Sequence, residues 1–218
     1  MELIQGFVDL VLHLDRHLLE LVGTYGVWIY AILFLIVFCE TGLVVTPFLP
    51  GDSLLFVAGT VAGTGAMDVH TLVLLLTLAA VLGNSVNYAV GRWVGPRVFR
   101  LEDSWLFKRA YLERTHAYFE RYGGTTIVIT RFIPIVRTYA PFAAGIGGMT
   151  YWRFSLFNVI GAVLWVAGLT YAGYFFGNLP LIKNNLSLVI IGIIIVSVAP
   201  AIVEFARHKL RAGGVTGD

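Results

Sequence analysis

Apolar residues form four long stretches of the chain that contain no Asp, Glu, Lys or Arg. These stretches cover residues 21–39, 69–91, 154–182 and 184–203. A helix needs ~20 predominantly apolar residues to cross ~30 Å of bilayer hydrocarbon, and each stretch is long enough. The pattern therefore predicts about four transmembrane helices.

Two further apolar stretches, residues 41–67 and 125–150, are interrupted by charged and helix-breaking residues. Proline removes a backbone donor and clashes with the preceding helical turn. Backbone that is interrupted at membrane depth must be buried in protein or face a water-filled cavity. We therefore expect each stretch to form a re-entrant helical hairpin, with the breaks at Pro47, Pro50, Gly51, Pro134 and Pro141.

Polar residues that recur every three or four positions predict two amphipathic helices, because this spacing places them on one helical face. The first lies in residues 1–24 and the second in residues 97–122. The first polar face is more acidic than basic, which favours packing against the protein over binding to a lipid surface, although both interpretations stay open. The polar positions are Glu2, Gln5, Asp9, His13, Arg16 and Glu20 in the first helix, and Arg109, Glu113, His116 and Glu120 in the second.

Residues 25–96 and 123–182 share an ordered series of short motifs. The two segments would start from opposite sides of the membrane, so the series predicts an inverted repeat, a design typical of transporters with interrupted helices. Chance similarity between glycine-rich apolar helices is the alternative. The matched motifs are Tyr25-Gly26 and Tyr122-Gly123, Pro50 and Pro134 in Phe-x-Pro, Ala58-Gly59 and Ala144-Gly145, and Gly91/Gly95 and Gly173/Gly177.

Composition supports a single membrane domain over residues 1–218. The chain is 58% hydrophobic and 13% charged, with a mean hydropathy of +0.82, far from the values of soluble domains. Its net charge of +2, without basic runs interleaved with aromatic residues, argues against nucleic acid as a partner. Cys39 is the only cysteine and no histidine has metal-ligand spacing, so we expect no disulfide, metal or cofactor.

Basic residues gather between positions 92 and 121 and again in the tail, residues 207–218. By the positive-inside rule, both the 97–122 segment and the C-terminus should be cytoplasmic. The two crossings between them, the second a C-terminal transmembrane helix over residues 183–206, return the chain to the same side. The side of the N-terminus stays open, because residues 21–39 could span the membrane or form one arm of the first hairpin.

Four charged residues lie in or directly beside the two interrupted stretches: Glu40, Asp52, Arg131 and Arg137. Each charge near the centre of a membrane helix costs about 2.5–3.5 kcal/mol on insertion scales, so these residues must pair or line water. Pro134 lies between the two arginines and interrupts the helix, so one continuous helix does not fix their relative positions. We expect the four side chains to share a polar pocket. The alternative is that Asp52 only caps a helix and Glu40 forms a structural ion pair.

The residues around these charges resemble the DedA family, also called the VTT or SNARE-associated Golgi protein family. The resemblance covers nearly the whole chain and rests on three groups of residues. These are Glu40 and Gly42 followed by Pro47-x-x-Pro50-Gly51-Asp52; Gly83-Asn84, Asn87-Tyr88 and Gly91-Arg92; and Arg131-Phe-x-Pro134-x-x-Arg137 followed by Ala144-Gly145, Met149, Phe154, Asn158, Gly161 and Trp165.

The resemblance implies a multi-pass protein of the bacterial inner membrane that moves a phosphate-bearing lipid, undecaprenyl phosphate or a phospholipid, between leaflets and depends on the proton motive force. It implies that Glu40 and Asp52 act in proton coupling and that Arg131 and Arg137 bind the anionic head group. A proton-coupled transporter of a small ion or osmolyte is the alternative, and an enzyme is not expected. The sequence leaves open the head group, the direction of transport and the oligomeric state, including a homo-oligomer.

Overall fold

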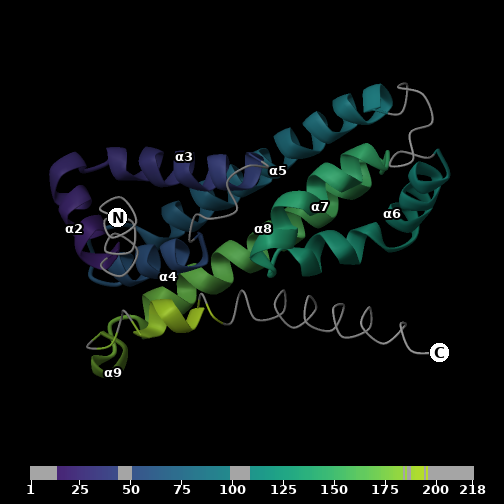
Figure 1. Cartoon of the computed structure of the whole chain (residues 1–218). Helices are drawn as coiled ribbons and strands as arrows, with labels where there is room; N and C mark the ends of the chain where they lie inside the picture. The colour runs from purple at the N-terminus through teal and green to yellow at the C-terminus, as the bar shows by residue number, and fades with distance from the viewer. Residues whose placement is uncertain are drawn as a thin grey trace, which may run out of the picture.

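The computed structural model describes residues 14–43, 51–98, 109–183, 185, 188–193 and 195 (Figure 1). Within these ranges every element of regular structure is an α-helix, which confirms the all-α fold for this part of the chain. The helices are α2 (Leu14–Tyr25), α3 (Trp28–Gly42), α4 (Gly51–Ala62), α5 (Val69–Val98), α6 (Arg109–Thr130), α7 (Pro134–Ile146), α8 (Tyr151–Phe176) and α9 (Pro180–Lys183).

Several predicted features lie outside the described residues. They include the first part of the N-terminal amphipathic helix, the breaks at Pro47 and Pro50, most of the C-terminal transmembrane helix and the whole basic tail. The structure therefore leaves these predictions as they stand.

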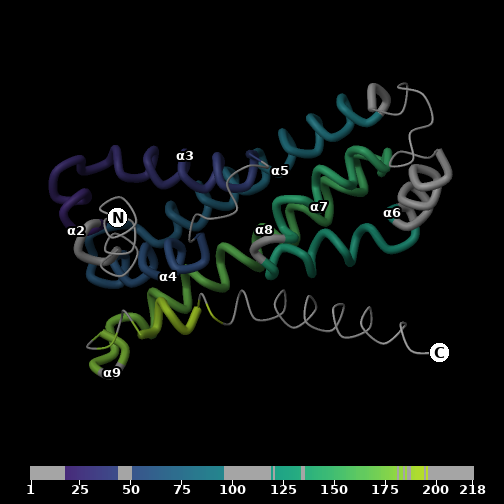
Figure 2. The backbone as a smooth tube through the Cα atoms, in the orientation of Figure 1, coloured from purple at the N-terminus to yellow at the C-terminus, as the bar shows by residue number. Residues whose placement is uncertain are grey.

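Within the described ranges, two helices are long and apolar enough to cross a membrane: Val69–Gly95 within α5, and α8. They correspond to the predicted crossings at 69–91 and 154–182, although α8 begins and ends earlier than the second of these. Figure 2 traces both as long helices through the molecule, and α5 packs against α8.

The predicted crossing at residues 21–39 is not one continuous helix. The chain turns at Gly26, which has a φ of 53°, and its N–H donates to the carbonyl of Val22 over 2.9 Å. Glycine commonly ends a helix in this left-handed conformation because it has no Cβ to clash. The apolar helix that follows, α3, has 15 residues, and its length of about 22 Å is less than the hydrocarbon thickness.

The interrupted stretches contain two short helices, α4 with 12 residues and α7 with 13. They begin at Gly51 and Pro134, two of the expected breaks. Pro141 does not break the chain, which corrects our expectation, because it lies inside the continuous helix α7. An interior proline costs about 3 kcal/mol. The extensive packing of α7 against α5 offsets this cost.

The helix predicted to end at Tyr122-Gly123 also continues further. Helix α6 runs through this position to Thr130. Here the glycines serve close packing rather than chain reversal. A Cβ on Gly123 would crowd the Met149 side chain, and one on Gly124 would overlap the ring of Phe157.

Helices of the two predicted repeats pack crosswise, α4 against α8 and α7 against α5. At the α4–α8 contact, a Cβ on Gly59 would overlap the carbonyl of Thr170, and one on Gly173 would overlap that of Phe56. At the α7–α5 contact, a Cβ on Gly145 would overlap the carbonyl of Tyr88, and one on Gly91 would overlap that of Phe142. Residues matched by the repeat therefore make matched contacts in the two halves.

Buried polar residues separate two apolar clusters. Along α5, Ala80 belongs to the first cluster and Tyr88 to the second, and the buried Asn84 and Asn87 come between them. Along α8, Asn158 likewise comes between Phe154 of the second cluster and Ala162 of the first. The two long apolar helices α5 and α8 thus carry a layer of buried polar residues between the apolar clusters.

Candidate functional site

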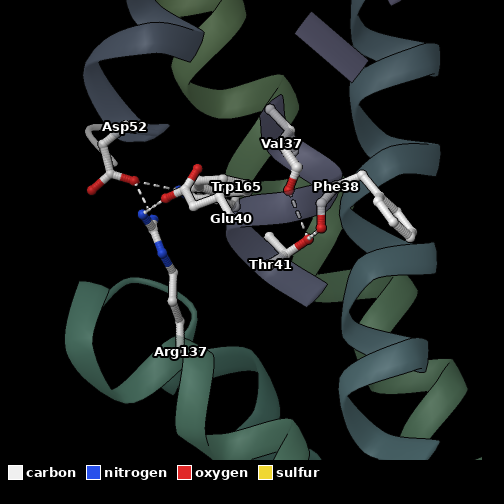
Figure 3. A network of polar contacts seen from close by, with 7 residues as sticks. All are labelled: Val37, Phe38, Glu40, Thr41, Asp52, Arg137 and Trp165. Carbon is white, nitrogen blue, oxygen red and sulfur yellow. Dashed lines mark hydrogen bonds and ion pairs between the residues drawn. The ribbon is translucent and has the colours of Figure 1, made fainter. Parts of the chain in front are cut away.

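Arg137 bridges two carboxylates from different helices (Figure 3). Its Nη1 donates to Oδ1 of Asp52 over 2.6 Å, and its Nη2 donates to Oε1 of Glu40. All three residues are buried, with exposures of 6% for Arg137, 9% for Asp52 and 1% for Glu40. We call these three residues the charge triad.

The helices that carry the triad place two of its charges at unfavourable helix ends. Glu40 lies in the last turn of α3, where the helix dipole disfavours an anion, and Arg137 lies in the first turn of α7, where it disfavours a cation. Asp52, in the first turn of α4, is at the favourable end. The ion pair between Glu40 and Arg137 must therefore offset two free-energy costs, the removal of both charges from water and the unfavourable dipole at each helix end.

Trp165 of α8 connects the triad to the fourth predicted charge. Its indole Nε1 donates to Oδ1 of Asp52 over 2.8 Å. The guanidinium carbons of Arg137 and Arg131 lie 4.8 and 5.8 Å from the centroid of its ring. Both distances fall within the range of cation–π attraction, so one aromatic side chain stabilises both arginines.

Arg131 is buried beside the triad but has a different set of partners. Its Nη1 donates to the carbonyl oxygen of Asn158 over 2.8 Å and to Oδ1 of the same residue over 3.2 Å, and its Nη2 donates to the carbonyl of Ala80 over 3.2 Å. Among the described residues, no carboxylate lies within ion-pair distance of it. Within the described part of the chain, the guanidinium of Arg131 is thus held by carbonyl and amide dipoles and the Trp165 ring rather than by a carboxylate, a costly arrangement for a buried charge.

Asparagine side chains hold the surrounding helices together. Asn84 Nδ2 donates to Oδ1 of Asn158 over 3.0 Å, which fixes the amide that holds Arg131. Asn87 Nδ2 donates to the carbonyls of Thr41 in α3 and Thr138 in α7, over 3.3 and 2.8 Å. Asn87 therefore ties α5 to both elements that carry Glu40 and Arg137.

Two buried polar atoms of the triad, Oε2 of Glu40 and Nε of Arg137, have no hydrogen-bond partner among the described residues. Such atoms are uncommon in proteins and mark places where a water, a proton or a ligand can be accommodated. The Glu40 carboxylate also lies against Gly51, where an added Cβ would overlap both of its oxygens. Gly51 is therefore required for the position of Glu40, in addition to starting α4.

The sequence prediction of a shared pocket holds for three of the four charges. Glu40, Asp52 and Arg137 meet, whereas Arg131 occupies an adjoining site on the same tryptophan. Site residues that we did not predict are Trp165, Asn158 and Asn84. A usable signal was present, because Asn158 and Trp165 are seven residues apart on one face of an apolar helix, and polar residues in membrane segments usually mark functional positions.

Comparison with protein families matches residues 49–175 of the chain to the VTT domain. The matched range contains Asp52, Arg131, Arg137 and Trp165 and begins after Glu40. No solved structure matches the chain significantly.

Curated relatives cover the chain more completely. Protein DedA of Escherichia coli K12 is 56% identical over 214 residues, which is 97% of this chain and 98% of that protein. The uncharacterized membrane protein Rv0364 of Mycobacterium tuberculosis is 44% identical, over 90% of this chain and 87% of its own length. The inner membrane protein YqjA of Escherichia coli K12 is 43% identical, over 70% of this chain and 69% of its own length.

Proposed function

Because the chain belongs to the DedA family of VTT-domain membrane proteins, we propose that it moves a phosphate-bearing lipid between the leaflets of its membrane in a proton-coupled cycle. The names of two of these relatives, Rv0364 and YqjA, state a membrane location, and none of the three names states an activity. The single observation that carries the proposal is the buried charge triad beside a second buried arginine that lacks a carboxylate partner among the described residues.

Guanidinium groups suit a phosphate ligand because their planar donors match its oxygens. Both guanidinium groups lie near the ring of Trp165. Among the described residues, Arg131 has no carboxylate partner, and Nε of Arg137 has no hydrogen-bond acceptor. A head-group phosphate that approached the two arginines would pair directly with Arg131, which has no carboxylate partner among the described residues. It would pair with Arg137 after the carboxylates bound to Arg137 had moved aside.

Charge balance then links the lipid to protons. Two carboxylates and two guanidinium groups have no net charge, so a phosphate added to this layer would leave uncompensated anions in a buried site. An unpaired buried charge is expensive, and carboxyl groups relieve the cost by taking up protons. We therefore assign proton coupling to Glu40 and Asp52 and phosphate binding to Arg131 and Arg137.

The proposal includes a membrane arrangement. Helices α4 and α7 would belong to two opposed re-entrant hairpins, and their crosswise contacts with α8 and α5 are what an inverted repeat requires. Helix α3 would form one arm of the first hairpin, since it is short. With the C-terminal helix, the chain would cross a bacterial cytoplasmic membrane several times and keep residues 97–122 and the C-terminus in the cytoplasm.

The proposal is tested with the full-length protein in liposomes that carry a labelled phospholipid or undecaprenyl phosphate in one leaflet. We expect protein-dependent transfer that responds to a pH gradient. Arg137→Lys should slow transfer, because one ammonium cannot replace two separate guanidinium nitrogens. Glu40→Gln should remove the dependence on the gradient while the protein stays folded.

Two results would contradict the proposal. Absence of lipid transfer together with a proton-driven flux of a small ion or osmolyte would favour the alternative transporter class. Native transfer rates in a variant with all four charges neutralised would show that the charged layer has only a structural role.

A further inference from the structure

An apolar groove of about 630 Å³ leads from the outer surface of the helices to the charge triad. One wall is formed by α8, including Leu164, Trp165 and Gly168, and the opposite wall by residues 189–193. Asp52 and Trp165 are the lining residues that also belong to the charged site. The groove therefore contains one carboxylate, that of Asp52, and its other described lining residues are apolar, aromatic or glycine.

Two glycines on opposite walls widen this groove. A Cβ added to Gly168 or Gly192 would meet no heavy atom within 4 Å. Gly59 and Gly173, which lie at the α4–α8 contact, differ from these two glycines. A Cβ at either position would overlap the backbone of the facing helix. Gly168 and Gly192 therefore do not bring two helices together, and their missing side chains leave open space in the groove.

We propose that this groove binds one hydrocarbon chain of the lipid whose phosphate group reaches the arginines. The inference rests on the proposed function and assigns the apolar part of its substrate site. The groove is open on its outer side, where Leu164 is 53% exposed and Phe132 is 49% exposed. In a membrane, the medium at that opening is lipid hydrocarbon, and the volume lies within the usual range of ligand pockets.

The polar end of the groove explains why an amphiphile fits better than a purely apolar molecule. Among the described residues that line it, Asp52 is the one ionisable group, and Nη1 of Arg137 lies 2.6 Å from its Oδ1. A chain seated in the groove would hold its phosphate ester at Asp52. Transfer of Arg137 from Asp52 to the phosphate would then require Asp52 to be protonated or displaced, which joins chain binding to the proton step.

Leucine substitutions at the open glycines test the groove directly. Gly168→Leu and Gly192→Leu each place a side chain in the open space from a different wall. Gly23→Leu is the matched control, because Gly23 lies in α2 and a Cβ there also meets nothing within 4 Å. Retention of a single thermal unfolding transition identifies variants that fold.

The readout is photo-crosslinking of the full-length protein in liposomes with lipids that carry a diazirine in the hydrocarbon chain. One arm uses an acyl phospholipid and the other a polyprenyl phosphate, which distinguishes the two sources of such a chain. We expect label on peptides from α8 and residues 188–193, and a decrease of at least about tenfold, or 1.4 kcal/mol of binding free energy, in both leucine variants but not in Gly23→Leu.

The outcomes separate the groove from the proposed function. Native labelling in both leucine variants, or labelling confined to other helices while lipid transfer proceeds, would overturn the groove and leave the transport proposal intact. Groove labelling that the substitutions abolish, without any transfer by the wild-type protein, would support the chain site and count against transport. Crosslinks to a second copy of the chain in place of lipid would assign the groove to an interface between copies and overturn the inference.

Discussion

Trp165 donates its indole hydrogen to the Asp52 carboxylate over 2.8 Å. The two residues come from α8 and α4, and these helices approach each other closely through Gly59 and Gly173. The position of the carboxylate is therefore set by the packing of two helices as well as by its ion pair with Arg137. A shift of α4 along α8 would break this hydrogen bond and move Asp52 relative to the arginine.

Trp165→Phe should weaken this coupling, because it keeps an aromatic ring beside the arginines and removes the N–H donor. A hydrogen bond to a charged group contributes about 1.5–3 kcal/mol, so we expect the free energy of unfolding to fall by about this amount and lipid transfer to slow. Thermal unfolding in detergent and transfer in liposomes measure the two effects. Trp152→Phe is the control, since Trp152 is 76% exposed, and an equal effect in both variants would contradict the role of Trp165.

Removal of Arg137 should destabilise the protein more strongly than any other change to the triad. Arg137→Gln leaves Glu40 and Asp52 buried without their shared cation, and breaking a buried pair in this way costs about 3–5 kcal/mol. Combining it with Glu40→Gln and Asp52→Asn removes the unpaired charges and should restore much of the stability. Transfer should stay absent in the triple variant, because the phosphate site and the proton sites are lost. Recovery of transfer with recovery of stability would contradict the proposed roles.

Much of the fold follows from sequence pattern because apolar length decides which helices can span a bilayer. The long apolar helices α5 and α8 were predicted from this length, and Pro134, one of the expected breaks, lies at the start of α7. The errors share one cause, which is that glycine and proline have more than one role. Gly123 permits close packing where we expected a helix end, and Pro141 lies within a helix where we expected a break. The first amphipathic helix ends at Tyr25, close to the expected position, and the turn at Gly26 separates it from α3.

The site was predictable in its residue types and less so in its pairing. Uncompensated charges in an apolar chain must find partners, so all four charged residues were expected to share one pocket. Arg131 is the exception, because it occupies an adjoining site. Which arginine pairs with both carboxylates depends on how α3, α4 and α7 meet in three dimensions. The spacing of residues along the sequence does not determine this. The same limit applies to Trp165, because its role comes from contacts with residues far away in the chain.

The repeat predicts matched effects of mutation in the two halves. Gly59→Ala and Gly145→Ala would each force a Cβ against a carbonyl of the facing helix, those of Thr170 and Tyr88 respectively. Overpacking of this kind costs about 1–3 kcal/mol, whereas an unhindered Gly→Ala change in a helix stabilises by about 0.4–1 kcal/mol. We expect both variants to unfold at a lower temperature than the wild-type protein, and we expect no such decrease for Gly23→Ala. Loss at only one of the two sites would contradict the equivalence of the halves.

Acid should weaken the start of α5 through Asp68. This exposed residue directly precedes the helix, and its Oδ1 accepts the backbone N–H of Thr71 over 2.7 Å, the geometry of an N-terminal cap. The bond favours the ionised carboxylate and lowers the pKa of Asp68 below its ordinary value of 3.8. Since the pKa is lower in the folded state, the stabilisation is fully present above the unfolded value and is lost as the pH falls through the folded one.

Unfolding temperatures of wild-type protein and Asp68→Asn, measured from about pH 5 to about pH 2, isolate this contribution. Asn keeps a capping oxygen but cannot titrate, so the wild-type protein should lose more stability than the variant as the pH falls. Asp68→Ala should be less stable than both at neutral pH, because the N–H of Thr71 loses its acceptor. Parallel curves for wild-type protein and Asp68→Asn over the whole range would show that the ionised carboxylate gives the helix start no additional stability, since amide and carboxylate would then cap α5 equally well.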